Sequence, residues 1–396
     1  STVNGERCEA EDQGQVCYHC SQLRVREGGT MNWKRTMPPA VRDMEFAEYA
    51  TSREERPVAV DCSLGTNPLG SPESSGRICR SASLPDPCPY PGDDLPFREG
   101  LSKYWGGSFS PEEVIPGTGS IGLIISVART FCAPGSIVLG AVPQFPDGPM
   151  HFQFSGAAYR AVRLAPPLFR LEIGALLSAI KGDESIVYLD RPHNPTGQAP
   201  PLKDLRPLAD TCDESGTLLV VDEAYGDFIP PEESAIQLNN RSVIVLRSFS
   251  KGKGLAGIRT GYAIVRDPEA HRFMRKVAPP FSITSTALEM AVASLEDAEY
   301  TARSVEITGS IKRKVLRAIE GTPGVICAET HPDVPILLVS TLSKNANLYE
   351  TLMAAGIRSE AGTCFEGLGP ESVRLRIPSP GDLEIFLERW SSAFGK

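Results

Sequence analysis

The segment 248–262, with the sequence SFSKGKGLAGIRTGY, decides how this chain is interpreted. It directly follows the apolar run VIVL at 243–246, so it places Lys251 at the end of a predicted buried strand, among hydroxyls and glycines. Although a lysine of pKa ~10.4 is a poor nucleophile, its amine can condense with an aldehyde to give an imine that exchanges with a substrate amine. Hydroxyl and guanidinium donors suited to a phosphate come from Ser248, Ser250 and Arg259. The alternative interpretation is a Gly/Ser turn with incidental charges.

A second signal lies upstream, where the apolar run 218–221 ends in Asp222. A buried carboxylate is costly unless it is paired. A protonated pyridine nitrogen is a suitable partner for the carboxylate because it is positively charged. Keeping that nitrogen charged makes the ring an electron sink. Tyr225, three residues later, is placed to donate to the phenolic oxygen of such a ring. The alternative is an aspartate that caps the following turn.

Two turns complete the pattern. The turn 193–197 (HNPTG) follows a predicted strand and presents Asn194 at the carboxyl edge of the sheet, where ligands bind in open α/β folds. The turn 116–120 (PGTGS) precedes a predicted helix, whose first backbone N–H groups suit an anion. Each of these two turns alone is weak evidence, but all four motifs occur in order and each lies beside a predicted strand of one sheet.

The pattern along the chain predicts an α/β fold with two domains. Short apolar runs alternate with segments of helical period, which predicts a mostly parallel sheet between two helical layers. Strands are expected at 136–139, 159–164, 185–189, 217–221, 242–246 and 261–265, and helices at 120–130, 202–215 and 268–277. After residue 285, a helix-prone stretch (286–319), apolar runs at 336–339 and 372–377, and an amphipathic stretch (381–394) predict a smaller α+β domain.

The expected organisation is therefore an arm over residues 1–57 and a segment over 58–93 that packs with the smaller domain. A large three-layer α/β/α domain follows over 94–285, and the smaller domain spans 286–396. Residues 71–93 are rich in Ser, Pro and Gly and are expected to form a loop.

Composition excludes several classes of protein. The chain has 396 residues and a formal net charge of −9, which argues against nucleic-acid binding. No apolar run approaches the ~20 residues of a membrane span, and the polar N-terminus does not resemble a secretory signal, so a cytoplasmic protein is expected. The segment Cys17-Tyr-His-Cys20 has metal-like spacing, but no second Cys/His pair follows. We therefore expect reduced thiols there and no metal.

These motifs resemble the class I/II aminotransferase family of pyridoxal 5′-phosphate (PLP) enzymes, of fold type I. Within it they are similar to the subgroup of histidinol-phosphate aminotransferase and L-threonine-O-3-phosphate decarboxylase. The resemblance runs from about Asp61 to the C-terminus. The pattern Ser-x-Ser-Lys…Gly-x-Arg-x-Gly is highly specific and is intact here, and the segment 67–70 (NPLG) resembles one in the decarboxylase.

The resemblance implies a role for each matched residue. Lys251 would hold the cofactor and then act as base and acid, and Asp222 would pair with the pyridine nitrogen. Asn194 and Tyr225 would contact the phenolic oxygen. The other implied cofactor contacts are Gly119, Ser120, Ile121, Ser248 and Arg259 at the phosphate, Phe145 stacked on the ring, and Tyr90 at the phosphate of a neighbouring subunit. The last match implies a homodimer with shared active sites.

Arginines near the C-terminus would bind the substrate carboxylate. The matching positions are Arg358, Arg374 and Arg376, and strand alternation places Arg374 and Arg376 on the same face. Arg374 is preferred because the downstream register then fits the family, whereas ordinary solvent exposure is the alternative for the other two. Asn67 and Asn194 are further candidates for substrate contact.

Two departures from the family pattern affect the expected reaction. His193 stands where the family more often has Asn, so it is a candidate acid/base or substrate contact; the alternative is a neutral turn residue. The chain also lacks the His-Gly-Gly segment associated with the phosphate group of the decarboxylase substrate, which argues against a phosphorylated substrate.

The expected activity is amino-group transfer on a small amino acid, which is the most common activity of the family. Decarboxylation, and β/γ-replacement in a C–C bond-forming synthase, are alternatives because the same fold supports them all. A non-catalytic PLP-fold binding or regulatory module is a further alternative, against which the intact Lys251 and Asp222 argue.

Overall fold

The computed structural model describes residues 38–44, 56–80, 85–86, 88–343 and 346–395. Most of the predicted arm and the segment Cys17-Tyr-His-Cys20 lie outside these residues. From the arm, the structure describes the short helix α2 (Pro39–Asp43).

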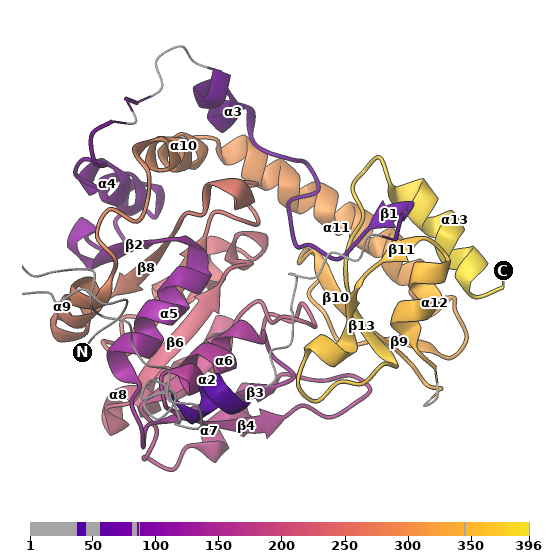
Figure 1. Ribbon diagram of the computed structural model, residues 1–396, viewed down its shortest axis with the longest axis horizontal. Coiled ribbons are helices and arrows are strands. Elements are labelled where there is room, and N and C mark those ends of the chain that lie inside the picture. Colours follow the sequence, from indigo (N-terminus) through magenta and orange to yellow (C-terminus); the bar gives the residue numbers. More distant parts are fainter. Residues whose placement is uncertain (1–37, 45–55, 81–84, 87, 344–345, 396) are drawn as a thin grey trace, which may run out of the picture. The chain divides into compact units, whose positions relative to one another are not determined.

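A seven-stranded sheet carries most of the predicted motifs (Figure 1). Its strands are β2 (Val114–Gly117), β3 (Ile137–Val142), β4 (Ala158–Arg163), β5 (Ile186–Asp190), β6 (Leu218–Glu223), β7 (Val243–Ser248) and β8 (Gly261–Val265). They are arranged in the order β2-β8-β7-β6-β5-β3-β4. β8 is antiparallel to both of its neighbours, and the other pairs are parallel. The predicted mostly parallel α/β fold is thus confirmed; β2, part of which was assigned to the turn 116–120, was not predicted.

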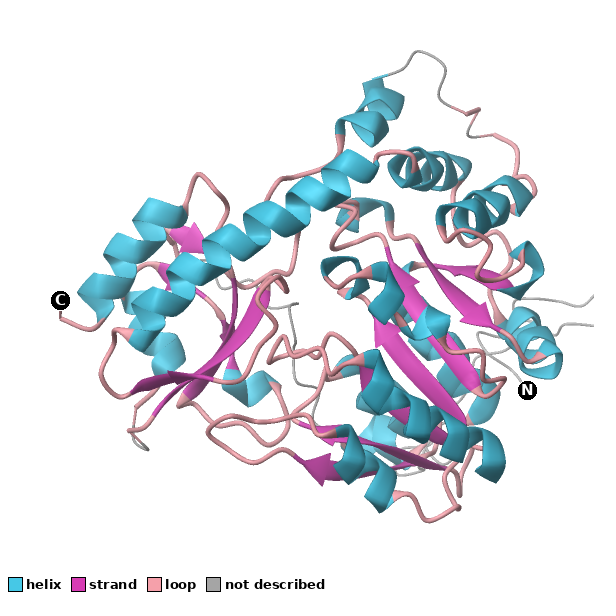
Figure 2. Ribbon diagram, turned by 180° about the vertical axis from the view of Figure 1, so that it is seen from behind, coloured by secondary structure: helices cyan, strands magenta, loops and turns pink. Residues whose placement is uncertain are grey.

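Helices cover both faces of this sheet, as Figure 2 shows from the reverse side. Alternate strand residues face opposite ways. Leu219 and Val221 belong to one buried cluster, with α4 (Leu95–Tyr104), α7 (Ile173–Ala179), α8 (Leu202–Ser215) and α10 (Ser285–Leu295). Val220 and Ile244 belong to another, with α5 (Gly119–Phe131), α6 (Asp147–Phe154) and α9 (Pro268–Val277). Each such buried side chain contributes about 1.5–3 kcal/mol, so the sheet is held from both sides.

A four-stranded antiparallel sheet follows in the C-terminal part, in the order β12-β13-β10-β9. Its strands are β9 (Val325–Cys327), β10 (Ile336–Thr341), β12 (Glu360–Ala361) and β13 (Ser372–Arg376). A separate buried cluster joins this sheet to α11 (Ala298–Glu320), α12 (Leu348–Ala354) and α13 (Leu383–Ala393). The upstream strand β1 (Val60–Asp61) pairs in parallel with β11 (Ile357–Arg358). The predicted domain boundaries remain predictions.

Two expected elements differ in the structure. The helix-prone stretch 286–319 forms two helices, because the Asp297 side chain accepts a hydrogen bond from the Tyr300 N–H and begins α11. The predicted loop over 71–93 contains a helix, α3 (Glu73–Arg80). Ser75 of α3 donates a hydrogen bond of 2.9 Å to the carbonyl of Met290 in α10, so tertiary packing overrides a weak local propensity.

Short 3₁₀ turns connect several elements. They are η1 (Pro111–Glu113), η2 (Gly226–Phe228), η3 (Pro231–Glu233), η4 (Ala235–Gln237), η5 (Ala256–Ile258) and η6 (Gly362–Cys364).

Candidate active site

A cavity of about 360 Å³ lies where the parallel strands β5, β6 and β7 end. Open α/β sheets bind ligands at this edge, because the loops after the strands meet there. Residues from separate parts of the chain line it. Those predicted from the sequence are Ser120, Ile121, Phe145, Asn194, Asp222, Tyr225, Ser248, Ser250, Lys251 and Arg259.

One part of the cavity is suited to an anion. Ser120 and Ile121 lie in the first turn of α5, where backbone N–H groups lack partners within the helix. Arg259 adopts a left-handed conformation (φ 53°) and donates to Ser250 Oγ at 3.1 Å. Gly119 has φ 76°, and a Cβ atom on it would lie 2.8 Å from Arg259 Nη2. The glycine therefore lets the guanidinium lie against the start of the helix.

Another part of the cavity is suited to a cation. Asp222 is 3% exposed, and its Oδ1 accepts a hydrogen bond of 3.0 Å from the Ala224 N–H. Tyr188 donates to its Oδ2 over a long 3.5 Å. Burial raises the pKa of Asp222 to about 7. An ionised carboxylate in this position is stabilised by a positively charged partner.

Lys251 lies beside Tyr225 in the same cavity. Its Nζ is 5.4 Å from the centre of the Tyr225 ring. A Cβ atom on Gly65 would lie 2.9 Å from Lys251 Nζ and would overlap the Tyr225 hydroxyl. Asn67 does not line the cavity; its Nδ2 donates to the carbonyls of Lys251 and Gly252 at 3.1 Å each. Asn67 thus fixes the backbone that carries the lysine.

These features fit PLP. Its phosphate suits the helix N-terminus with Arg259, and its protonated ring nitrogen suits the buried Asp222. An amine that can condense with the aldehyde is provided in the same cavity by Lys251.

His193 lies outside the cavity lining, although its neighbours Pro192 and Asn194 belong to it. It is fully buried, with Nδ1 2.8 Å from Thr196 Oγ1 and Nε2 3.0 Å from the Pro143 carbonyl oxygen. Burial lowers its pKa to about 4, so the imidazole is neutral at pH 7. Of the two interpretations from the sequence, this environment favours a neutral turn residue over an acid/base or substrate contact.

The three candidate arginines also lie outside the cavity lining. Arg374 is buried, donates to the Ser63 carbonyl and lies 3.4 Å from Glu360 Oε2. Arg376 donates to the carbonyls of Asp61 and Ile377. Arg358 forms an ion pair of 3.2 Å with Asp61. All three therefore contact the segment that leads to the cavity residues 64–66.

Several cavity residues were not predicted from the sequence. They are Leu64, Gly65, Thr66, Asp147, Asp190, Pro192, Ala224 and Ala256. Asp190 carries a signal that was available, because it ends an apolar strand just as Asp222 does. The residues of 64–66 give no such signal, because they reach the cavity only through tertiary packing.

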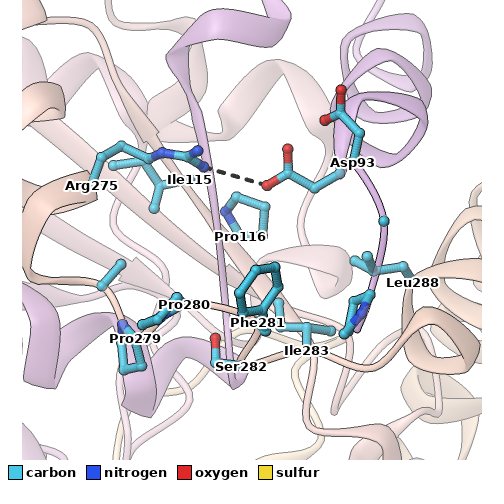
Figure 3. Close-up of a pocket in the computed structure, with 14 residues that line it drawn as sticks. Asp93, Ile115, Pro116, Arg275, Pro279, Pro280, Phe281, Ser282, Ile283 and Leu288 are labelled. Atoms are coloured by element: carbon cyan, nitrogen blue, oxygen red, sulfur yellow. Dashed lines mark hydrogen bonds and ion pairs between the residues drawn. The ribbon is translucent and has the colours of Figure 1, made fainter. Parts of the chain in front are cut away.

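Tyr90 lies away from this cavity. Its side chain is 79% exposed and its ring centre lies 4.8 Å from that of Phe281, which is also exposed. A second cavity of about 350 Å³ lies beside Phe281 and is bordered by the ion pair between Arg275 and Asp94, at 3.4 Å (Figure 3). The two cavities share no lining residue.

Among the described residues, no group of His, Cys, Asp and Glu side chains is placed to hold a metal ion. In the same part of the chain, every helix is too short or too polar to cross a membrane.

Comparison with known proteins identifies the family. Residues 90–389 match the model of the family described as aminotransferase class I and II. The match covers more than half of the chain, so the chain belongs to this family. This membership confirms the predicted family, the prediction of an enzyme, and PLP as the cofactor.

Individual relatives agree with this result. A histidinol-phosphate aminotransferase of Methanothermobacter thermautotrophicus is 28% identical over 328 residues, or 81% of this chain and 85% of the relative. One of Nitratidesulfovibrio vulgaris is 31% identical over 285 residues, or 70% of this chain and 74% of the relative.

Solved structures support the fold. A histidinol-phosphate aminotransferase of Sinorhizobium meliloti in complex with PLP superposes with a TM-score of 0.77 at 22% identity, covering 90% of this chain and 97% of that one. An aspartate aminotransferase of Thermus thermophilus with maleate gives 0.76 at 21% identity, covering 89% and 98%.

Proposed function

We propose that the protein is an aminotransferase that binds PLP in the cavity at the ends of β5, β6 and β7. The observation that carries this proposal is the composition of that cavity. A helix N-terminus with Arg259, the buried carboxylate Asp222 and the amine of Lys251 come from distant parts of the sequence and line one space.

Each cavity residue that was predicted from the sequence has a role in this proposal. Bound PLP supplies a ring that withdraws electrons from the bonds at the substrate Cα. Lys251 Nζ removes the proton from Cα and returns one to the product. Asp222 keeps a proton on the ring nitrogen, and Asn194 and Tyr225 orient the ring through its phenolic oxygen.

The remaining cavity residues hold and cover the cofactor. Phe145 covers one face of the ring and excludes water from it. The phosphate is held by the N–H groups at the start of α5 and by the side chains of Ser120, Ser248, Ser250 and Arg259.

We propose an amine with an anionic group as the substrate. Arg374 supports this, because it is buried and donates to Ser63, one residue before the cavity residue Leu64. A guanidinium is suited to bind an anionic group through paired hydrogen bonds. The names of the relatives make histidinol phosphate the first compound to test, beside small α-amino acids.

The test is mass spectrometry of purified protein incubated with PLP and each candidate amine, with and without a keto acid. We expect amino transfer that requires the keto acid. It should be lost in Lys251→Ala and retained in Lys203→Ala, which removes an exposed lysine of α8. Release of carbon dioxide without a keto acid would instead show a decarboxylase and overturn the proposal.

We further propose a homodimer in which Tyr90 reaches the partner's phosphate site. Its exposed ring, which packs at a tilt against that of Phe281 and does not line the cavity of its own chain, supports this arrangement. Exposed aromatic pairs of this kind are typical of surfaces that a partner covers.

A further inference from the structure

A second buried carboxylate, Asp190, lines the cavity beside Asp222. Asp190 is the last residue of β5, and it is the direct Cα partner of Asp222 on the adjacent parallel strand β6. Side chains at paired positions of parallel strands lie on the same face of the sheet. Each residue is 3% exposed and both line the same cavity. The edge of the sheet therefore presents two carboxylates where one was predicted.

Asp190 also holds the turn that carries Asn194. Its Oδ2 accepts a hydrogen bond of 2.7 Å from the Asn194 N–H. Asn194 lines the cavity, so Asp190 links the acidic part of the cavity to a predicted cofactor contact.

Most titratable groups that face Asp190 from the surrounding elements are uncharged near neutral pH. Tyr188 of β5 and Tyr159 of β4 have pKa values raised by burial. His193, with Nε2 4.0 Å from Asp190 Oδ1, has its pKa lowered by burial to about 4. Asp222 and, on α6, Asp147 are the facing carboxylates.

Burial raises the pKa of both members of the pair. Burial raises the pKa of Asp190 to about 7, and both burial and the charge of Asp190 raise that of Asp222. Two buried carboxylates on adjacent strands that line one cavity are coupled, so their titration belongs to the pair, and protonation of at least one of them is favoured until a cation arrives. A cation placed against them allows both to ionise.

We propose that Asp190 is a positioning residue that acts with Asp222 as a two-carboxylate site for the protonated ring nitrogen of the cofactor. This inference rests on the proposed function, because the cation is that of the bound PLP ring. Asp222 would hold the protonated nitrogen, and Asp190 would strengthen the negative field there while it fixes the Asn194 turn.

The experiment compares the wild type with Asp190→Asn, which keeps the shape and an oxygen that can accept from the Asn194 N–H. The probe is 4-deoxypyridoxine 5′-phosphate, which retains the ring nitrogen and phosphate but has no aldehyde, so Lys251 chemistry does not contribute. Its Kd is measured with cofactor-free protein from pH 5.5 to 8.5.

The two proteins should bind the probe equally at pH 5.5, where Asp190 is protonated and as neutral as asparagine. At pH 8.5 the variant should bind about tenfold more weakly, as expected if the cation lowers the pKa of Asp190 by about one unit. A carbocyclic analogue, with carbon in place of the ring nitrogen, is the matched control and should bind both proteins equally at each pH.

A ratio of Kd values that does not change with pH would overturn the inference, because it would show that Asp190 only supports the turn. Equal binding at every pH would overturn it too. If the wild type fails to bind the probe at all, the proposed function fails instead.

A second measurement uses the wild type alone, in case the variant does not fold. Calorimetry at pH 7 in two buffers of different ionisation enthalpy counts the protons released on binding. More protons should be released with the nitrogen ring than with the carbocyclic analogue, and equal release would contradict the inference.

Discussion

Gly65 is a cavity residue at which the structure leaves no room for a larger side chain. A Cβ atom there would overlap the Tyr225 hydroxyl and approach Lys251 Nζ. We therefore expect Gly65→Ala to displace both side chains and to weaken PLP binding by about tenfold or more, since a misplaced contact costs roughly 1–3 kcal/mol. Absorbance titration with PLP measures this. Gly174→Ala is the control, because nothing lies within 4 Å of a Cβ atom at that exposed position; equal PLP affinity in both variants would contradict the geometry.

Asp222 should make the cofactor-free protein less stable as the pH rises. Its folded pKa of about 7 is raised above the unfolded value of ~3.9, so its contribution to stability is present below pH ~4 and is lost as the pH rises to about 7. Asp222→Asn removes this loss. At ~1.4 kcal/mol per pKa unit, we expect the cofactor-free variant to gain roughly 4 kcal/mol over the wild type at pH 8 and only about 1 kcal/mol at pH 4.5.

Thermal unfolding at fixed protein concentration, at both pH values, tests this expectation. Asp204→Asn, an exposed position in α8, is the control and should show no such dependence. With PLP present, the wild type should be more stable than Asp222→Asn, because the variant lacks the carboxylate that pairs with the ring nitrogen. A variant less stable than the wild type at pH 8 without PLP would refute the argument.

Among single residues, the sequence predicted those whose position in the site follows from their immediate neighbours in the chain. Lys251, Asp222 and Asn194 follow apolar strands, and the carboxyl ends of those strands meet in any parallel sheet. Asp190 follows the same rule and was missed because the family resemblance gives that position no role. Gly65 reaches the cavity through the path of the segment after β1, which no local pattern encodes.

Helices and strands with a regular apolar pattern and clear start or stop residues were predicted almost to the residue. The helices α8 and α9 and the strand β8 have the predicted bounds. Helix α8 ends at Gly216 in the left-handed conformation, and Asp267 caps α9 through its side chain. The helix α3 was missed because its stability comes from packing on α10, which the composition of 71–93 does not reveal.

A buried lysine holds the loop before β10 against helix α11. Lys312 Nζ lies 2.6–3.0 Å from four acceptors, which its three N–H groups share. They are Thr330 Oγ1 and the carbonyl oxygens of His331, Val334 and Ile336. The His331 N–H donates in turn to the carbonyl of Gly197, in the turn that carries Asn194. This chain of bonds links helix α11 to the turn that carries the cavity residue Asn194.

Removing that amine should destabilise the protein and loosen the Asn194 turn. Lys312→Met leaves buried oxygens without donors, which costs about 3 kcal/mol. We expect a lower Tm and a severalfold higher Kd for PLP. Lys314→Met, at an exposed position of the same helix, should change neither. A variant with reduced Tm and unchanged Kd would show that the loop is structural and uncoupled from the cavity.

The whole molecule combines a sheet edge that forms the cavity with the exposed Tyr90–Phe281 pair, which we propose that a second copy covers. The first follows from strand order, which the alternation of apolar runs and helices predicts. The second is formed by residues that lie far apart in the sequence and pack at a tilt against each other at the surface. Only the resemblance, and no pattern of polarity, suggested in advance that Tyr90 serves another subunit.

Shared active sites predict complementation between two inactive variants. Tyr90→Ala should bind PLP roughly 10–100-fold more weakly, because a hydrogen bond to a charged group is worth about 1.5–3 kcal/mol, and Lys251→Ala should be inactive. In a mixed dimer, the subunit that keeps Lys251 receives Tyr90 from its partner, so one of its two sites is complete. Refolding equal amounts together should yield about half mixed dimers, and hence about a quarter of the wild-type activity at limiting PLP. Activity equal to the mean of the separate variants would show that Tyr90 serves its own subunit or none, since no mixed site would then be restored.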